Sequence, residues 1–284
     1  MGSAPESSEL DLRLSELRSQ LIGLGSVLVA FSGGVDSAFL LAAASRALPP
    51  GAVLAATAVS PSLPAAELAA AAEVAAGLGV RHLTPSTAEL RRPGYRANSG
   101  DRCYHCKAEL LDVLRPLASA YGLAAIATGT NADDAVAGFR PGIRAAAERG
   151  ACTPLRDVGL TKAQIRAASR MWGLSTWDKP AAACLSSRVA YGIEITPHRL
   201  ARVETAERAV RAALSAAGYV VRDLRVRDLG RVARVEVDPA LVPVLAGRPD
   251  LGMLVRGFDR VEVDPRGFRS GAMNELLQEP ELFR

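Results

Sequence analysis

A glycine-rich segment next to an apolar run constrains the fold of this chain more than any other part of its 284 residues. Residues 27–31 (VLVAF) predict a short buried strand, and residues 36–48 predict a helix. At their junction, SGGVDS (residues 32–37) combines paired glycines, which allow close backbone approach, with two serine hydroxyl groups. Because backbone N–H groups and the helix dipole converge where a strand turns into a helix, this segment predicts a phosphate-binding loop.

This segment is not a Walker A loop, because the GxxxxGK[ST] spacing and its lysine are absent. An ordinary glycine-rich turn would account for the two glycines. It would not require the two serines and the aspartate around them, so the phosphate-binding interpretation is favoured.

The alternation of strands and helices continues through the first 130 residues. Leu10, Leu14, Leu17 and Leu21 have the spacing of an amphipathic helix that precedes the first strand. Further strands are expected near residues 52–59, 80–83 and 124–128, with helices that begin at Pro64 and after Cys103. This pattern predicts an α/β fold with a parallel sheet, helices on both faces and sites at the carboxyl ends of the strands.

The pattern changes in the second half of the chain. A capping-box sequence at residues 161–164 begins a helix that ends near Trp172, and a loop rich in Pro, Ala and Ser extends to Tyr191. Beyond Thr196-Pro197, we expect a long helix, a hairpin that turns near Leu229-Gly230, a short helix and a strand around residues 261–263. The sequence therefore predicts two domains, residues 1–192 and a smaller α+β domain of residues 193–284.

Charge and aromatic content limit the kinds of partner. A net charge of +4 without a basic run, and only 5% aromatic residues, argue against a nucleic-acid surface and favour small anions. The N-terminus has no apolar leader, and the longest uncharged stretches are interrupted by Gly-Gly or by prolines. We therefore expect a cytoplasmic protein that binds neither nucleic acid nor membrane.

The cysteines of such a protein are expected to be reduced and to act as thiolates, metal ligands or nucleophiles. Cys184 lies between Lys179 and Arg188, and nearby cations favour the thiolate. A buried, unreactive thiol is the alternative. No motif surrounds Cys152, which is expected to pack in the core.

Lysine is rare in this chain, which has three lysines beside 31 arginines. Lys107 and Lys179 lie in the two segments that contain Cys103, Cys106 and Cys184. Lys162 lies at what we interpret as an ordinary helix start. A lysine ammonium is a compact charge on a flexible stem, and the planar guanidinium of arginine cannot replace it in every role. Lys107 and Lys179 are therefore candidate functional residues.

SGGVDS resembles the loop of the PP-loop ATP pyrophosphatases, which share an adenine-nucleotide α-hydrolase fold and cleave ATP to AMP and pyrophosphate. The resemblance implies ATP and Mg²⁺ as cofactors, a PP-loop domain over residues 1–192, and TGTNADD (residues 128–134) as a second nucleotide or Mg²⁺ element. The implied nucleotide-binding residues are Ser32, Gly33, Gly34, Asp36, Ser37, Gly129, Asp133 and Asp134. Asp36 and Asp134 are the candidate Mg²⁺ ligands. For Asp133 and Asp134, an Asx-rich turn with a helix cap is the alternative.

Four longer motifs narrow the resemblance. They are RCYHCK (102–107), GTNADD (129–134), DKPAAACLSSRVAYGIEIT (178–196) and GFRSGAMNE (267–275). Together they resemble the LarE family of ATP-dependent sacrificial sulfur transferases, over nearly the whole chain. This family serves synthesis of a nickel-pincer nucleotide cofactor.

The resemblance to LarE implies a specific reaction. A carboxylate of pyridinium-3,5-biscarboxylic acid mononucleotide is adenylylated, and a cysteine thiolate displaces AMP to give a thioester. Abstraction of the cysteine Cα–H then expels the thiocarboxylate and leaves dehydroalanine. By its place in ACLSSR, the sacrificed residue here would be Cys184.

Further residues are assigned around this cysteine. Lys107, Lys179 and Glu207 are candidate catalytic residues, and Tyr191 is a further candidate base for the Cα proton. The candidate substrate-binding residues are Ser187, Arg188, Arg225, Arg227 and Arg269. Because Arg225 and Arg227 alternate on one face of a predicted strand, their guanidinium groups could bind the substrate phosphate. A solvated strand face is the alternative. The C-terminal domain is expected to bind substrate and to support a homo-oligomer.

Cys103 and Cys106 leave several possibilities open. With Cys184 they could bind an iron–sulfur cluster that carries an extra sulfide, as some LarE relatives are thought to do. The alternatives are substrate-lining thiols, a zinc site or a redox pair. For the whole chain, the alternative functions are an amide ligase like NAD or GMP synthetase, an iron–sulfur-dependent thiolation enzyme, a tRNA-thiolating enzyme, or a nucleotide sensor without turnover.

Overall fold

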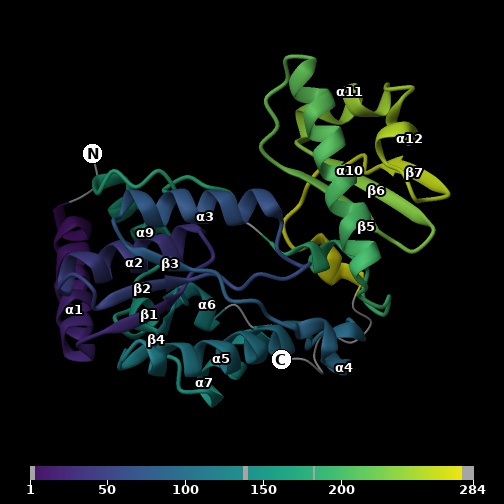
Figure 1. Cartoon of the computed structure of the whole chain (residues 1–284). Helices are drawn as coiled ribbons and strands as arrows, with labels where there is room; N and C mark the ends of the chain where they lie inside the picture. Colours follow the sequence, from purple (N-terminus) through teal and green to yellow (C-terminus); the bar gives the residue numbers. More distant parts are fainter. Residues whose placement is uncertain (1–3, 137–139, 182, 277–284) are drawn as a thin grey trace.

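A four-stranded parallel sheet forms the centre of the first half of the chain (Figure 1). The computed structural model describes residues 4–136, 140–181 and 183–276. The strands are β1 (Val27–Ala30), β2 (Val53–Ala56), β3 (Arg81–Leu83) and β4 (Ala125–Thr128), in the order β3-β2-β1-β4. β1 thus lies between β2 and β4, with Val27 opposite both Val53 and Ala125. The loops that follow β1 and β4 therefore meet at the same edge of the sheet.

Helices cover both faces of this sheet because the side chains of β1 alternate between two apolar clusters. Val27 and Val29 pack with α1 (Ala4–Leu24), α2 (Val35–Ala47) and α9 (Lys162–Met171). Leu28 and Ala30 pack against α5 (Arg102–Ala120) on the other face. α3 (Ala65–Gly77) lies beside α2, and the shorter elements are η1 (Glu89–Arg91), α4 (Pro93–Arg96), α6 (Ala132–Val136), α7 (Pro141–Glu148), α8 (Pro154–Asp157) and η2 (Leu185–Arg188).

The last part of the chain forms a second, smaller sheet. β5 (Leu224–Asp228) and β6 (Val232–Val237) form an antiparallel hairpin, and β7 (Arg260–Val263) pairs parallel to β6. The long helix α10 (Pro197–Ala216) packs its apolar face on this sheet in a separate cluster. The remaining elements are η3 (Pro239–Leu241), α11 (Val242–Ala246), α12 (Leu251–Leu254) and η4 (Ala272–Leu276).

The predicted fold class is confirmed: an α/β unit with a parallel sheet, followed by a smaller α+β region. The loop expected before Tyr191 contains one short helix, η2. Near the predicted boundary the chain contacts both halves, because the Ala190 N–H donates to Asp228 O at 2.9 Å and the Gly192 N–H donates to Asn98 O at 3.1 Å. The division between residues 192 and 193 stays a prediction.

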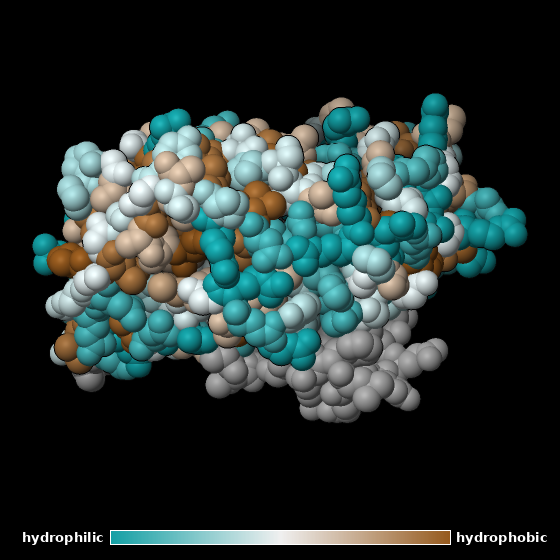
Figure 2. Space-filling model, turned by 60° about the horizontal axis from the view of Figure 1, so that its bottom comes forward, coloured by the Kyte–Doolittle hydropathy of each residue, from teal (hydrophilic) through white to brown (hydrophobic). Residues whose placement is uncertain are grey.

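The outer surface carries mixed side chains. Figure 2 shows hydrophilic residues across the middle of one face, with hydrophobic residues in separate groups. Within the described ranges, no helix is both long and apolar enough to cross a membrane.

Candidate active site

The predicted phosphate loop connects β1 to α2 and is closed by its own serines. The hydroxyl groups of Ser32 and Ser37 are 3.0 Å apart, and Ser37 Oγ donates to Gly34 O at 3.2 Å. Gly33 has a φ of +67°, and a Cβ there would lie 3.0 Å from Ala71. The second glycine, Gly34, is the N-cap of α2. The loop therefore requires a glycine at residue 33 and directs the start of α2 toward the end of the sheet.

A cavity of about 330 Å³ opens beside this loop. Gly129, which follows β4, also lines this cavity and packs directly against the loop, since a Cβ there would lie 2.8 Å from the backbone nitrogen of Ser37. One carboxylate oxygen of Asp36, Oδ1, is buried without a hydrogen-bond partner in the part of the chain that the structure describes. The other oxygen, Oδ2, accepts a hydrogen bond from Lys162 Nζ at 2.5 Å. An unpartnered carboxylate oxygen beside a phosphate loop fits a bound metal ion or its water ligand.

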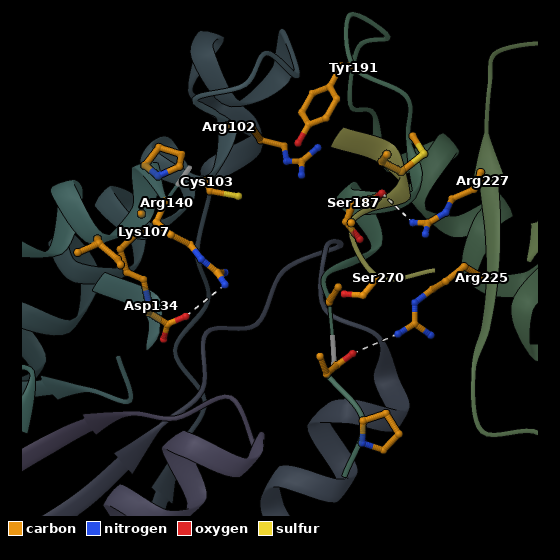
Figure 3. A pocket seen from close by; sticks show the side chains of 18 of the residues that line it. Arg102, Cys103, Lys107, Asp134, Arg140, Ser187, Tyr191, Arg225, Arg227 and Ser270 are labelled. Atoms are coloured by element: carbon orange, nitrogen blue, oxygen red, sulfur yellow. Dashed lines mark hydrogen bonds and ion pairs between the residues drawn. The ribbon is translucent and has the colours of Figure 1, made fainter. Parts of the chain in front are cut away.

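A larger cavity, of about 600 Å³, lies between the two halves of the chain (Figure 3). One wall comes from α5 and the start of α7, the other from β5, the cysteine loop and the segment before η4. The labelled side chains that face it are Arg102, Cys103, Lys107, Asp134, Arg140, Ser187, Tyr191, Arg225, Arg227 and Ser270. Cationic groups line both walls, so the cavity fits an anionic ligand.

The two cavities meet at three residues. Lys107, Thr130 and Asp134 line both of them. Burial lowers the pKa of Lys107, partly offset by the charges of Cys106, Cys103 and Asp134. The two cavities are therefore adjacent, and their shared wall carries one cationic and one anionic side chain.

The loop of Cys184 is bound to both halves of the chain. Leu185 N–H donates to Ser62 O at 2.8 Å, and the Ser186 hydroxyl is 2.5 Å from Tyr95 OH. From the other side, Arg188 pairs with Glu207 of α10 at 2.9 Å. These contacts fix the backbone around the half-buried Cys184.

The carbonyl oxygen of Cys184 accepts three hydrogen bonds, one of them from the Ser187 backbone N–H at 3.0 Å and the other two from side chains. Arg188 Nη1 donates to it at 2.9 Å, and Ser187 Oγ donates to it at 2.7 Å. Arg188 also donates to the carbonyl of Ala183. The donors of Arg188 are thus used within the loop and by Glu207, which argues against Arg188 as a direct ligand of the substrate.

The three other cysteines have different surroundings. Cys103 lies on the wall of the larger cavity. Desolvation of its thiol raises the pKa, and the charge of Arg102 partly offsets this. Cys106 packs in an apolar cluster, where burial and then the charge of Cys184 raise its pKa to about 12. Cys152 packs against the main core, which confirms its predicted position.

An iron–sulfur or zinc site has no support in the arrangement of these side chains. Within residues 4–136, 140–181 and 183–276, no group of three or more His, Cys, Asp or Glu is placed to bind a metal ion. Cys103 and Cys106 nevertheless both lie close enough to Cys184 for their charges to interact.

Most of the predicted nucleotide-binding residues lie together. Ser32, Gly34, Asp36, Ser37, Gly129 and Asp134 line the smaller cavity. Asp133 lines neither cavity, and its carboxylate accepts the Lys162 backbone N–H at 2.7 Å. Asp134 lines both cavities and has the geometry of the Asx-turn alternative, because the Asn131 N–H donates to Asp134 Oδ2 at 3.2 Å and the Asp134 N–H donates to Asn131 Oδ1 at 3.1 Å. Their roles in binding ATP and Mg²⁺ stay predictions.

The predicted catalytic residues do not all reach the larger cavity. Lys179 Nζ donates to Gly33 O at 3.1 Å and pairs with Glu67 at 2.8 Å, so it supports the phosphate loop. Glu207 accepts the Val226 backbone N–H at 3.0 Å in addition to its ion pair. Neither side chain lines the described wall of a cavity, and the catalytic roles of Lys179 and Glu207 stay predictions.

The three arginines that were predicted to bind the substrate phosphate do not all lie at the larger cavity. Arg225 and Arg227 both face the larger cavity, and a buried nitrogen of Arg227, Nε, has no hydrogen-bond partner among the described residues. Arg269 instead pairs with Glu275 and is absent from the described wall of the cavity. The predicted cluster of three arginines is thus a pair.

Sequence reasoning missed three functional candidates. Lys162, interpreted as part of an ordinary helix start, contacts the phosphate loop, and its rarity as a lysine was the available signal. Arg102 and Arg140 line the larger cavity. Arg102 opens the motif RCYHCK, which was the available signal, whereas Arg140 lies outside the four motifs.

Fold and site together define an ATP-utilising enzyme of the PP-loop superfamily. The family model for asparagine synthase matches residues 15–95, which include the phosphate loop. The chain is 32% identical over 276 residues to pyridinium-3,5-bisthiocarboxylic acid mononucleotide synthase of Lactiplantibacillus plantarum, covering 96% of this chain and 98% of that protein. It therefore belongs to the family of this synthase, the LarE family, as the sequence motifs predicted.

Two other relatives are uncharacterized. A protein of Synechocystis sp. is 42% identical over 273 residues, which cover 94% of this chain and 99% of that protein. A protein of Methanocaldococcus jannaschii is 27% identical over 175 residues, or 61% of this chain and 66% of that protein.

Proposed function

We propose that this protein uses ATP to adenylylate a carboxylate of pyridinium-3,5-biscarboxylic acid mononucleotide and converts it to a thiocarboxylate with the sulfur of Cys184. One observation carries the proposal: the cavity at the phosphate loop and the cavity beside the cysteine loop meet at Lys107, Thr130 and Asp134. Membership in the family of a bisthiocarboxylic acid mononucleotide synthase supports the substrate.

The smaller cavity would bind ATP. The phosphate loop would hold the pyrophosphate through backbone N–H groups at the start of α2 and the hydroxyls of Ser32 and Ser37. Asp36 and Asp134 would bind Mg²⁺, which neutralises charge on the leaving pyrophosphate. Lys107, at the junction of the cavities, would lie beside the α-phosphate and the attacking carboxylate oxygen.

The larger cavity would bind the mononucleotide. Arg225 and Arg227 project from one face of β5 toward the cysteine loop, where Arg227 donates to Ser187 O at 3.2 Å, and they would bind the phosphate. The pyridinium carboxylates would then point toward α5 and the junction.

Cys184 would act in two steps. Its thiolate attacks the acyl carbon, the C–S bond forms, the C–O bond to AMP breaks, and AMP leaves with the electron pair. A base then removes the Cα proton; the Cα–Cβ double bond forms, the Cβ–S bond breaks, and the thiocarboxylate departs. Negative charge that develops at Cα is delocalised onto the Cys184 carbonyl oxygen, where Arg188 and Ser187 donate hydrogen bonds.

A mass-spectrometric experiment tests the proposal. Incubation with ATP, Mg²⁺ and the biscarboxylated mononucleotide should convert Cys184 to dehydroalanine, with AMP released in proportion to thiocarboxylate formed. A Cys184→Ala variant should bind both ligands and release no thiolated product. Repeated turnover with an unchanged Cys184 would show that the sulfur has another source and would reject this mechanism.

A further inference from the structure

Five cationic side chains line the larger cavity, and the protein neutralises only some of them. Arg140 pairs with Asp134 at 3.3 Å, and Arg227 pairs with Glu236 at 2.7 Å. The other three are Arg102, Lys107 and Arg225. In the part of the chain that the structure describes, none of these three has a carboxylate within ion-pair distance. Because a cation withdrawn from water without a counter-ion costs free energy, these three positions favour bound anions.

Arg102 is the most deeply buried of the three. It lies in the first turn of α5 and is only 5% exposed. Its Nη1 donates to the side-chain oxygen of Asn98 and to Ser186 O at 3.1 Å. Both acceptors are neutral, and so are Cys103 and Tyr191, which also form side-chain hydrogen bonds with Arg102 and whose pKa values are raised by burial. These contacts fix the orientation of the guanidinium group without a carboxylate to balance its charge.

The position of Arg102 separates it from the other two cations. Figure 3 shows Arg102 next to Tyr191, with Lys107 further along the same wall and Arg225 on the opposite wall. The guanidinium carbon of Arg102 is 5.4 Å from the centre of the Tyr191 ring. The cavity is thus lined at three separate positions by a cationic side chain that has no carboxylate partner.

The proposed substrate also carries three anionic groups, one phosphate and two carboxylates. Arg225 lies beside Arg227 and fits the phosphate, and Lys107 lies at the junction and fits the carboxylate that reacts with ATP. We propose that Arg102 binds the second carboxylate, the one that is not being activated, and so selects dicarboxylated over monocarboxylated pyridinium mononucleotides. This inference rests on the proposed function.

A guanidinium group suits this task for two reasons. Nη1 is used by Asn98 and Ser186, and the other edge of the group, formed by Nε and Nη2, matches both oxygens of a carboxylate, which would fix the plane of the pyridinium ring. Its hydrogen bonds to Asn98 and Ser186 hold it in place before the ligand binds, so less conformational entropy is lost on binding. When one position has been thiolated, the same guanidinium would bind the thiocarboxylate while the second carboxylate reacts.

The test compares two ligands that differ by one carboxylate. Isothermal titration calorimetry without ATP would measure the binding of the biscarboxylated mononucleotide and of nicotinic acid mononucleotide. The variants are Arg102→Gln and Arg102→Lys, with Arg144→Gln as a control that removes a positive charge from α7 outside both cavities. We expect the wild type and the control to prefer the dicarboxylate by about tenfold or more, the effect of one charge-assisted contact.

The variants separate the possible outcomes. Arg102→Gln should bind the two ligands with similar affinity, and Arg102→Lys, which keeps the charge without the fork, should recover part of the preference. ATP binding by each variant checks that it is folded. An equal loss of affinity for both ligands in Arg102→Gln, or an unchanged preference, would overturn the inference. A wild type that binds neither mononucleotide would instead reject the proposed function.

Discussion

Replacing Arg188 by glutamine should slow the release of sulfur from Cys184 more than it slows the capture of the acyl group. Deprotonation at Cα places negative charge on the Cys184 carbonyl oxygen, which accepts hydrogen bonds from Arg188 at 2.9 Å and from Ser187 at 2.7 Å. Both bonds strengthen as that charge develops. The attack of the thiolate on the acyl-adenylate places charge on a different oxygen, that of the substrate.

The size of the effect follows from the type of donor. A hydrogen bond from a charged donor contributes about 1.5–3 kcal/mol. Since about 1.36 kcal/mol corresponds to a tenfold change in rate, loss of Arg188 should slow elimination roughly 10- to 150-fold. Ser187→Ala removes a neutral donor, which contributes about 0.5–1.5 kcal/mol, and should slow the step roughly 2- to 10-fold.

Stability must be separated from catalysis in this variant. Arg188 is 3% exposed and pairs with Glu207, so glutamine at residue 188 leaves a partly buried carboxylate without its cationic partner. The double variant Arg188→Gln with Glu207→Gln removes that charge, and Glu207→Gln alone is its reference, because Glu207 is itself a candidate catalytic residue. If it regains stability without regaining the elimination rate, the loss in the single variant is catalytic.

Intact-mass spectrometry after rapid quenching provides the assay. With ATP, Mg²⁺ and the mononucleotide, it distinguishes unreacted protein, the thioester adduct on Cys184 and the dehydroalanine product. The Arg188 variant should accumulate the adduct, which hydroxylamine should cleave. If the adduct instead forms slowly and then eliminates at the wild-type rate, Arg188 acts on binding or activation, and the reasoning is refuted.

Three further changes test other parts of the molecule. Gly129→Ala places a Cβ 2.8 Å from the Ser37 backbone nitrogen, so ATP binding measured by equilibrium dialysis should weaken about tenfold or more; unchanged affinity would place ATP elsewhere. Lys162→Met removes the lysine that pairs with Asp36 at 2.5 Å beside the phosphate loop. ATP affinity should fall, and added Mg²⁺ should restore part of it; an effect independent of Mg²⁺ would contradict this role. Asp228→Asn uncouples a fully buried carboxylate from two arginines of α10, and urea unfolding should show a loss of about 3–5 kcal/mol, whereas an unchanged midpoint would mean that these pairs contribute little.

The phosphate loop could be predicted because its evidence is local. A buried strand, two glycines and a helix start follow one another in the sequence, and their periodicities are distinct. The position of Lys162 could not be predicted in this way. The neighbouring capping box accounts for a helix start at Lys162 without any further role. The contact of Lys162 with Asp36 depends on β1 and β4 being neighbours, which the order of strands in the sequence does not determine.

The loop around Cys184 shows the same limit for side chains. An arginine close to a reactive cysteine suggests a ligand of the substrate, and Arg188 was predicted as one. Whether its fork turns toward the cavity or toward its own backbone depends on Glu207, which approaches from α10. The motif RCYHCK marked the segment of Arg102, but the significance of this arginine could not be predicted, because it comes from burial without a carboxylate partner, a property of the packed molecule.

The way the cysteine loop is held has a consequence for the protein after its reaction. Hydrogen bonds made by residues 185, 186 and 188 anchor the loop, and none of these bonds involves the sulfur of Cys184. A molecule that has given up this sulfur would therefore keep its shape and its two cavities. Protein that has lost this sulfur would still bind ATP and the mononucleotide without forming product. The yield of thiolated product would then depend on how quickly a cell degrades these molecules and synthesises new ones.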